Sequence, residues 1–589
     1  MLRLEYEEGT GMCMASQPSW KYYSKLSEMS RLRAIAESLF NNRNHGNGLR
    51  YVSPAEAYEM SCRLPWVTVT DLPMDESTVR RLGLPPDARV FNDNCGKTVG
   101  RSAEARIFYN RLASDEKLAL EEMLREAVYQ MQEGNRLVYA EAVIGLDAHL
   151  MLKARMIAPE SDISNIFHWY ANFTPLASVP EYEKSAELPV QDILFVSFPG
   201  WKSEEKRWSK GCVAVDEEHM TIFNLGMRYF GERKKGTLTM AWTAGMRMGM
   251  VAAHAGIKEV DFTQVPGLEQ RGKQIIAFYG LSGSGKSSHI NTMDNGGTLP
   301  REAVCRIAHD DAFQIDCRNR RSYVWEPALY DKTDSRDEKH QDWKYCITTQ
   351  NMLVIDYKGR IIPVGQDIRN NNGRALFSRD LLGKTTDRIG FPNVIGWLMK
   401  DSTLPPLVRL TSPALAVAMG ATLMTKRSSA ENVSAEDMEK LIFVPFANPF
   451  RVYPLAKDCL GYIEIFRSGC DCYIWSGGGG GMWNGSDNTL KTVPLNVSLT
   501  LQTAVLEGTL EWEDWELVEG ARIPTRASIE KILPGYYDRY NPRTVPNKAD
   551  FISTLKKRFQ QRRNFIMDSD IREYPDLMEE LVQSMKVNA

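Results

Sequence analysis

The chain has 589 residues, of which 43% are hydrophobic and 25% charged, and its formal net charge is −3. That length is too great for one hydrophobic core, so we expect two or three domains of ordinary globular composition. The small net charge gives no broad attraction to nucleic acid or anionic membranes, and no apolar run reaches the roughly 20 residues that cross a bilayer.

The start of the chain and its cysteines indicate a compartment. The first residues, MLRLEYEEGTG, are acidic and lack the apolar core of a secretory signal. The ten cysteines are scattered, and pairs such as Cys470 and Cys472 lack the partners of a zinc site. We therefore expect a cytoplasmic protein with reduced thiols and without nucleic-acid or membrane partners. The sequence leaves the oligomeric state open.

The sequence of the first part of the chain predicts a peripheral segment, a helix and two strands. Residues 1–50 lack clean periodicity and are predicted to be a peripheral N-terminal extension. Residues 114–134 carry apolar residues at helical spacing before a glycine, which predicts an amphipathic helix. Residues 190–200 and 212–226 read as strands, the second interrupted by an acidic turn.

The polar stretch from residue 261 to residue 274 predicts a domain boundary. We place a first domain at residues 51–265 and a second at 266–589. In the second, apolar runs at 351–359 and 391–399 predict strands, and NKADFISTLKKRFQQRRNFI predicts a late helix. Strands and helices mixed in this way predict an α/β fold.

The strongest motif is a phosphate-binding loop. The apolar run Ile275–Tyr279 leads into GLSGSGKSS, which matches G-x-x-x-x-G-K-[ST]. In such a loop backbone N–H groups converge on one anion, the lysine reaches the β and γ phosphates, and the next hydroxyl binds Mg²⁺. A chance glycine-serine loop is the alternative, which the preceding strand disfavours. The candidate nucleotide-binding residues are Gly280, Leu281, Ser282, Gly283, Ser284, Gly285, Lys286, Ser287 and Ser288.

Two adjacent carboxylates follow the loop by about 25 residues. The apolar segment before His309 ends at Asp310 and Asp311. Alone, such a pair is more often a solvated turn or a helix cap. After a phosphate-binding loop, an aspartate at a strand end is expected to support the bound Mg²⁺.

These motifs resemble those of ATP-dependent phosphoenolpyruvate carboxykinase, and Ser282 between the first two glycines is typical of that family. Upstream, VGRSAEA resembles the family's substrate loop, NLGMRYFGERKKGTLTMAW its tyrosine and lysine block, and MGMVAAHAG its metal-histidine segment. Downstream, WEPALYDKT, NNNGRALF and LPPLVRLT are similar to further family blocks in the same order. The resemblance implies a two-domain α/β fold, with a P-loop nucleotide-binding domain and an active-site cleft between the domains.

The resemblance also implies roles for individual residues. Arg101 and Arg374 would hold the carboxylate and the transferred phosphoryl group of the substrate, and Tyr229 would line the carbon dioxide and phosphoenolpyruvate site. A Mn²⁺ ion would be bound by Lys235, His254 and Asp311, with Lys234 nearby. ATP phosphates and Mg²⁺ would be held by Ser282, Lys286, Ser287 and Asp310, with Glu326 and Arg374 also at the nucleotide site.

The implied reaction converts oxaloacetate and ATP into phosphoenolpyruvate, carbon dioxide and ADP. A lysine must be neutral to bind a metal, so Lys235 needs a lowered pKa, to which Lys234 and Arg233 would contribute. Taken singly, these residues have plainer interpretations: Arg233 to Lys235 as a solvated basic turn, His254 as a core histidine, Tyr229 as packing, and Arg101 and Arg374 as surface ion-pairing residues.

The chain departs from the family pattern in three places. Asn432 stands where an arginine near the adenine is expected, the lid-like segment before LPP is shortened to DST (401–403), and a glycine run replaces a tryptophan-glycine pattern after Trp475. Two alternatives therefore stay open: a kinase of the same fold acting on another small molecule or a protein, and a nucleotide-binding regulator without catalysis.

Overall fold

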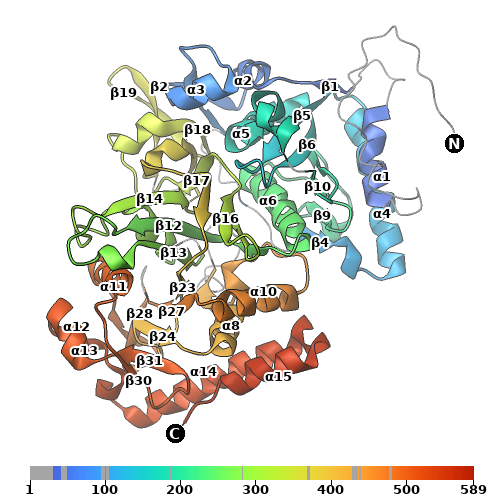
Figure 1. Ribbon diagram of the computed structural model, residues 1–589. Helices are drawn as coiled ribbons and strands as arrows, with labels where there is room; N and C mark the ends of the chain where they lie inside the picture. Colours follow the sequence, from blue (N-terminus) through green and yellow to red (C-terminus); the bar gives the residue numbers. More distant parts are fainter. Residues whose placement is uncertain are drawn as a thin grey trace.

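The computed structural model describes residues 31–41, 49–94, 100, 105–185, 187–281, 283–367, 372–427, 436, 440–476 and 480–588. Their fold is mixed α/β, as predicted, and its two largest sheets have eight strands each. In Figure 1 the first large sheet lies in the upper part, and the C-terminal helices form the lower part. The candidate site residues lie in the elements between this sheet and the C-terminal helices.

The first large sheet is built from the N-terminal half of the described chain. Helices cover both of its faces, because alternate residues of its strands are buried on opposite sides. Helices α5 (Ile163–Asn172) and α6 (Phe230–Arg247) pack on one face, and α1 (Arg31–Glu37) and α4 (Ser114–Gln132) on the other. The strand order is β1 (Arg50–Tyr51), β5 (Leu137–Ile144), β6 (Leu152–Pro159), β8 (Ile193–Phe198), β10 (Thr221–Leu225), β9 (Cys212–Asp216) and β4 (Arg106–Phe108), with β7 (Thr174–Pro175) beside β5.

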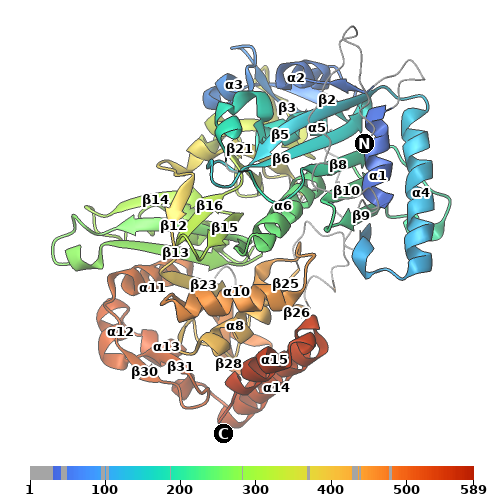
Figure 2. The same ribbon diagram turned by 45° about the vertical axis from the view of Figure 1, so that its right-hand side comes forward.

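These elements confirm the helix predicted at 114–134 and the strands predicted within 190–200 and 212–226. The described residues 31–41, however, are part of the packed structure and not peripheral. Leu32 and Ala36 of α1 are fully buried against α4, and the buried Arg33 contacts Asp192 at 2.7 Å. Figure 2 shows α1 and α4 side by side against this sheet.

The second large sheet contains the strand that leads into the phosphate-binding loop. That strand, β13, lies between an antiparallel neighbour, β12, and a parallel one, β23. The strand order is β14 (Val304–His309), β12 (Ala255–Asp261), β13 (Lys273–Tyr279), β23 (Val394–Leu398), β27 (Asp471–Trp475), β24 (Leu407–Leu410), β31 (Ala521–Pro524) and β30 (Trp512–Asp514). The boundary predicted between residues 265 and 266 falls between β12 and β13, which pair over seven residues.

A five-stranded sheet joins distant parts of the chain. Its order is β17 (Ala328–Lys332), β21 (Arg374–Ser378), β18 (Cys346–Gln350), β3 (Arg89–Asp93) and β2 (Val67–Pro73). A four-stranded sheet of β11 (Val251–Ala253), β15 (Phe313–Asp316), β16 (Arg321–Val324) and β22 (Arg388–Gly390) lies beside it. The strand predicted at 351–359 is β19 (Leu353–Tyr357), which forms a two-stranded sheet with β20 (Arg360–Val364).

The C-terminal helices cover the second sheet. The predicted late helix is α14 (Lys548–Asp568), which packs with α15 (Pro575–Ser584) against α8 (Pro413–Ala421). Its fully buried Arg562 reaches Asp401 at 2.7 Å. The shortened segment 401–403 is therefore fixed beneath this helix.

The buried carboxyl group of Asp458 is expected to make the stability of the fold depend on pH. Asp458, in α10 (Leu455–Arg467), is 3% exposed, and burial raises its pKa to about 6 although Tyr453 donates a hydrogen bond to it at 2.9 Å. The unfolded chain has a pKa near 4, so ionisation costs the folded state stability as the pH rises from about 4 to 6. Asp458→Asn should therefore stabilise the protein by about 3 kcal/mol above pH 6 and by little below pH 4. Denaturant unfolding across pH checks this, and an equal effect at pH 4 and 7 would contradict it.

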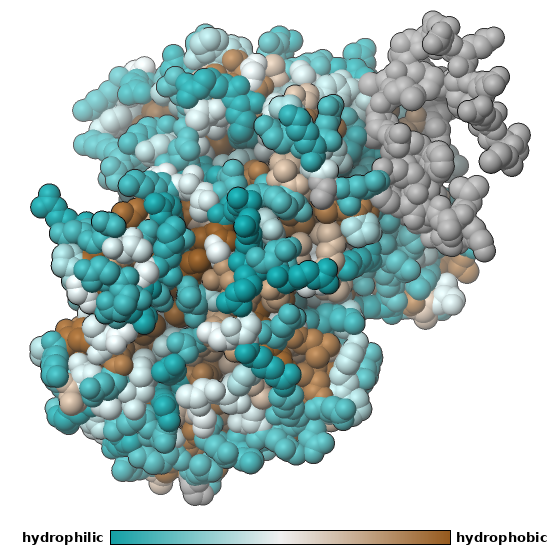
Figure 3. Space-filling model, in the orientation of Figure 1, coloured by the Kyte–Doolittle hydropathy of each residue, from teal (hydrophilic) through white to brown (hydrophobic). Residues whose placement is uncertain are grey.

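In the view of Figure 3 hydrophilic side chains predominate, and hydrophobic ones form patches across the middle and at the lower right of the described surface. Large exposed hydrophobic residues are scattered among the described elements, for example Leu118, Tyr129 and Leu490. Among the described residues, no helix combines the length and apolar character needed to span a membrane.

Candidate active site

Two glycines of the predicted phosphate-binding loop have backbone conformations that favour glycine. Gly283 and Gly285 have φ of +80° and +94°, which side chains rarely adopt. A Cβ on Gly280 would lie 2.1 Å from Ser284 Oγ and 3.0 Å from Leu398 Cδ1, so a larger residue would require these side chains to move. The following helix α7 (Lys286–Asn291) has six residues, so we expect the loop N–H groups, more than a long helix dipole, to contact an anion.

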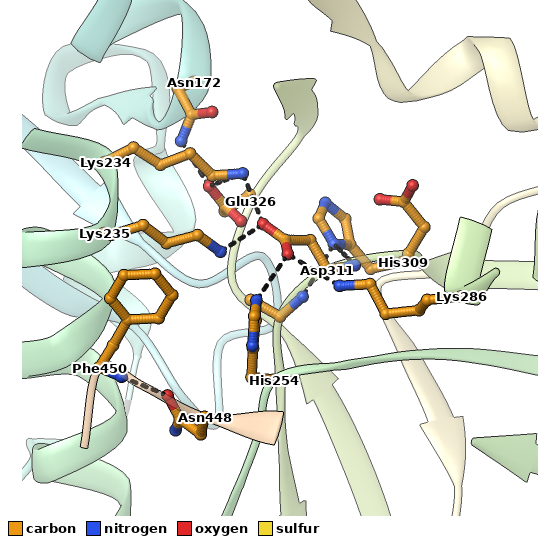
Figure 4. A network of polar contacts seen from close by, with 12 residues as sticks. Asn172, Lys234, Lys235, His254, Lys286, His309, Asp311, Glu326, Asn448 and Phe450 are labelled. Atoms are coloured by element: carbon orange, nitrogen blue, oxygen red, sulfur yellow. Dashed lines mark hydrogen bonds and ion pairs between the residues drawn. The ribbon is translucent and has the colours of Figure 1, made fainter. Parts of the chain in front are cut away.

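Asp311 is the centre of the site. Its Oδ2 accepts from Lys234 Nζ at 2.9 Å and Lys235 Nζ at 2.6 Å, and its Oδ1 lies 3.0 Å from Lys286 Nζ. His254 Nε2 lies 3.1 Å from the same Oδ1. Figure 4 shows these four side chains converging on one carboxylate from α6, the end of β11 and the start of α7. Burial opposes ionisation, but the three ammonium groups outweigh it and lower the pKa of Asp311 well below its usual range.

His254 is oriented by a strained turn. Its Nδ1 donates a hydrogen bond to the carbonyl oxygen of Ala447. Phe446 and Ala447 both have positive φ, of 49° and 52°, which costs free energy in non-glycine residues. Burial, with help from nearby lysines, lowers the pKa of His254 to about 3, so its Nε2 carries a lone pair at neutral pH.

The site fits a cation bound by nitrogen and oxygen. The lone pair of His254 Nε2 faces an Asp311 oxygen at 3.1 Å, a contact between two acceptors that a cation between them would stabilise. Burial, together with Lys234 and Lys286, lowers the pKa of Lys235 to about 8, which brings its neutral, ligating form within reach. Among the described residues no group of three His, Cys, Asp or Glu side chains could hold a metal, so this candidate depends on the lysine.

Arg233 does not act as expected. We predicted that it would lower the pKa of Lys235, but burial, Lys234 and Lys286 are the causes of that shift. Arg233 is fully buried and pairs with Asp162 at 2.9 Å, because its position on α6 turns its side chain toward the start of α5.

A second candidate cation position has oxygen ligands only. Ser287 Oγ lies 3.3 Å from Asp310 Oδ2.

The opposite wall can hold an anion. Arg374 Nε donates to Tyr229 Oη at 3.1 Å, and Lys332 pairs with Arg374 in the register of β17 and β21. The Tyr330 ring lies 6.2 Å from that of Tyr229. Two cationic groups and two hydroxyl groups therefore converge at this wall, as carboxylate or phosphate binding requires.

One cavity, of about 870 Å³ including the part open to solvent, joins these groups. It brings together most of the predicted site residues, namely Tyr229, Lys234, Lys235, His254, Leu281, Lys286, Ser287, Asp310, Asp311 and Arg374. It is also lined by residues that were not predicted for the site: Gly231, Leu329, Tyr330, Asp331, Lys332, Pro449 and Phe450. The sequence signal for Tyr330 and Lys332 was the block WEPALYDKT, whereas Phe450 had none.

Some predicted residues lie elsewhere. Glu326 does not line this cavity: it is fully buried behind Lys234, 3.3 Å from its ammonium group, and accepts from Asn172 at 2.6 Å. It is placed to support Lys234 and not to touch a nucleotide. Arg101, Ser282 and Asn432 lie outside the described residues.

Comparison with known proteins shows which proteins this chain is similar to. A family model described as phosphoenolpyruvate carboxykinase matches residues 95–529. The chain is 26% identical over 380 residues to "Phosphoenolpyruvate carboxykinase (ATP)" of Aeropyrum pernix, which covers 63% of this chain and 69% of that protein. It is 23% identical over 355 residues to "Phosphoenolpyruvate carboxykinase (ATP) 2" of Salinibacter ruber, covering 59% and 63%.

A third relative is "Phosphoenolpyruvate carboxykinase (ATP), glycosomal" of Trypanosoma cruzi, 24% identical over 337 residues, covering 55% of this chain and 65% of that protein. The aligned parts thus span about two thirds of the relatives' lengths. The family match covers well over half of this chain and includes every described residue of the cavity. The chain belongs to the ATP-dependent phosphoenolpyruvate carboxykinase family.

Proposed function

We propose that this protein converts oxaloacetate and ATP into phosphoenolpyruvate, carbon dioxide and ADP. Family membership and the names of the relatives support this reaction. The observation that carries it is the convergence of Lys235, His254 and Asp311 opposite Lys286 in one cavity that Tyr229 and Arg374 also line. Neither a different kinase reaction nor a regulator without catalysis is favoured by the comparisons.

The residues suggest how the cavity works. Arg374 and Tyr229 would bind and orient a carboxylate of oxaloacetate, and Lys286 would hold the β and γ phosphates of ATP. Loss of carbon dioxide leaves an enolate, whose oxygen then attacks the γ-phosphoryl group held beside it. Positive charge from Lys234, Lys286 and Arg374 would stabilise the negative charge that develops along this path.

Divalent ions complete the proposal. Use of ATP and a divalent metal follows from the family, and their identities, Mn²⁺ at Lys235, His254 and Asp311 and Mg²⁺ at Ser287 and Asp310, are proposed from the donor atoms. Such ions would supply Lewis acidity to the enolate and neutralise the charge of the triphosphate.

We also propose that the chain forms two domains with this cavity between them. Because two relatives are named as glycosomal, a cytoplasmic location stays a prediction.

The test is direct. Purified protein with Mg²⁺ and Mn²⁺ should release phosphoenolpyruvate from oxaloacetate and ATP, with one ADP for each phosphoenolpyruvate. If no nucleoside triphosphate supports this reaction, the proposal is wrong. Formation of another phosphorylated product from a panel of metabolites and peptides would support the alternative kinase.

His254 gives a separate prediction for the metal. His254→Ala removes one nitrogen donor and leaves the phosphate-binding loop intact, so the Mn²⁺ concentration needed for half-maximal activity should rise about tenfold. ATP affinity should change less than about twofold. Electron paramagnetic resonance of bound Mn²⁺ and nucleotide titrations measure the two effects. His149→Ala, at a histidine whose side chain is largely exposed, is the matched control and should change neither.

A further inference from the structure

Gln350, at the end of β18, lies beneath the anion-binding wall and is fully buried. In the sheet register it stands opposite Asp93 on one side and Arg374 on the other, and Arg374 in turn faces Lys332. The row Asp93–Gln350–Arg374–Lys332 therefore crosses four neighbouring strands, and its last two members line the cavity.

The direction of the Gln350 amide is fixed by its neighbours. Its Oε1 lies 3.1 Å from the backbone nitrogen of Phe230, which can only donate a hydrogen bond. Its Nε2 then points to Asp93 Oδ2, also at 3.1 Å. Asp93 is itself held, because it accepts from Asn94 N at 3.0 Å and from Ser164 Oγ at 3.2 Å.

This direction determines the hydrogen bonding of Tyr330. Tyr330 Oη lies 3.1 Å from Gln350 Oε1, and since the amide oxygen only accepts, the tyrosine must donate its single hydrogen to it. Tyr330 can therefore offer only an acceptor to the cavity. Tyr229 Oη accepts a hydrogen bond from Arg374 Nε, so its own hydrogen remains available. Tyr229 can therefore donate that hydrogen to Tyr330 Oη or to an oxygen of a bound ligand.

We propose that Gln350 is a positioning residue that sets the hydrogen-bond direction at this wall, so that Tyr229 and Arg374 both present donors to a carboxylate oxygen of the substrate. The inference rests on the proposed function for the identity of that substrate. Without Gln350, the hydroxyl hydrogen of Tyr330 could turn toward Tyr229 or into the cavity. The direction of the hydrogen bonds that meet the substrate oxygen would then no longer be fixed.

Two variants test this. Gln350→Met keeps the length of the side chain and removes its hydrogen bonds, so kcat/KM for oxaloacetate should fall about tenfold while KM for ATP changes less than about twofold. In a Tyr330→Phe background, which has no hydroxyl to redirect, Gln350→Met should add less than about a twofold loss. Equal losses in both backgrounds, or a parallel rise in KM for ATP with a lower melting temperature, would show a merely structural role.

An exchange of partners provides the stronger test. Gln350→Glu alone sets two carboxyl groups side by side and should lower kcat/KM for oxaloacetate at least about tenfold. With Asp93→Asn added, the new amide can donate to the carboxylate at position 350 and to Ser164, while its oxygen accepts from Asn94 N. The carboxylate at position 350 still accepts from Tyr330 and from the backbone of Phe230. The double variant should recover to within about threefold of wild type.

The outcomes separate the two proposals. If the wild-type protein makes no phosphoenolpyruvate, the proposed function fails, whatever the variants do. If the wild type is active but the exchange restores nothing, or Gln350→Met matches wild type, only the role of Gln350 is overturned. Phosphoenolpyruvate binding by calorimetry, without nucleotide, should follow the same order of variants.

Discussion

Asp311→Asn should lower the rate of phosphoenolpyruvate formation at least about a thousandfold, the largest effect expected of any single substitution here. The carboxylate contacts Lys234, Lys235 and Lys286 and faces His254, so its loss removes a candidate metal ligand and the counter-ion of three lysines together. Steady-state kinetics with Mn²⁺ and Mg²⁺ held in excess measures the loss.

The same change should cost stability. The side chains of Lys234, Lys235 and Lys286 are only 1%, 11% and 9% exposed, so without Asp311 buried positive charge is left unbalanced. We expect the free energy of unfolding to fall by about 3 kcal/mol. Asp514→Asn, at an exposed ion pair with Arg522, is the control and should change neither property. An active, fully stable Asp311→Asn protein would remove Asp311 from the centre of the site.

Lys286→Ala should reduce turnover at least about a hundredfold, because it removes a fixed charge aimed at the β and γ phosphates. KM for ATP should rise as well, whereas affinity for phosphoenolpyruvate alone should change little. Isothermal titration with each ligand separates these effects.

The matched control is Lys273→Ala, at the start of the strand that ends at the same loop, where the side chain is 55% exposed. It should retain wild-type kinetics. Unchanged turnover in Lys286→Ala would mean that phosphoryl transfer takes place elsewhere.

Local patterns predicted the elements that carry this site. The apolar run before Gly280 is β13, the turn at Asp310 follows β14, and the residues after Asn547 form α14. Each depends on periodicity or on glycine conformations, which a short window of sequence contains. The convergence of Lys235, His254 and Asp311 followed from family resemblance alone, since nothing in their spacing requires them to meet.

What could not be predicted depends on distant contacts. Phe450 is buried at the cavity because Asn448 and the strained turn before it set its direction, and no periodic pattern marks that turn. Glu326 was assigned to the nucleotide by its place in a motif, but packing against Asn172 turns it to Lys234. Gln350 is held by the backbone of Phe230 and by Asp93, and these lie 120 and 257 residues away in the sequence.

The five-stranded sheet has a consequence for how the chain folds as it is made. Strand β3 is an inner strand, but its partner β18 is translated about 257 residues later, which takes roughly 10 to 50 seconds on a ribosome. During that interval the open edge of β3 has no neighbour and could pair with another chain. Nascent chains that stop before residue 346 should therefore need chaperones more than the finished protein does, and the anion-binding wall is complete only after Arg374 has been added.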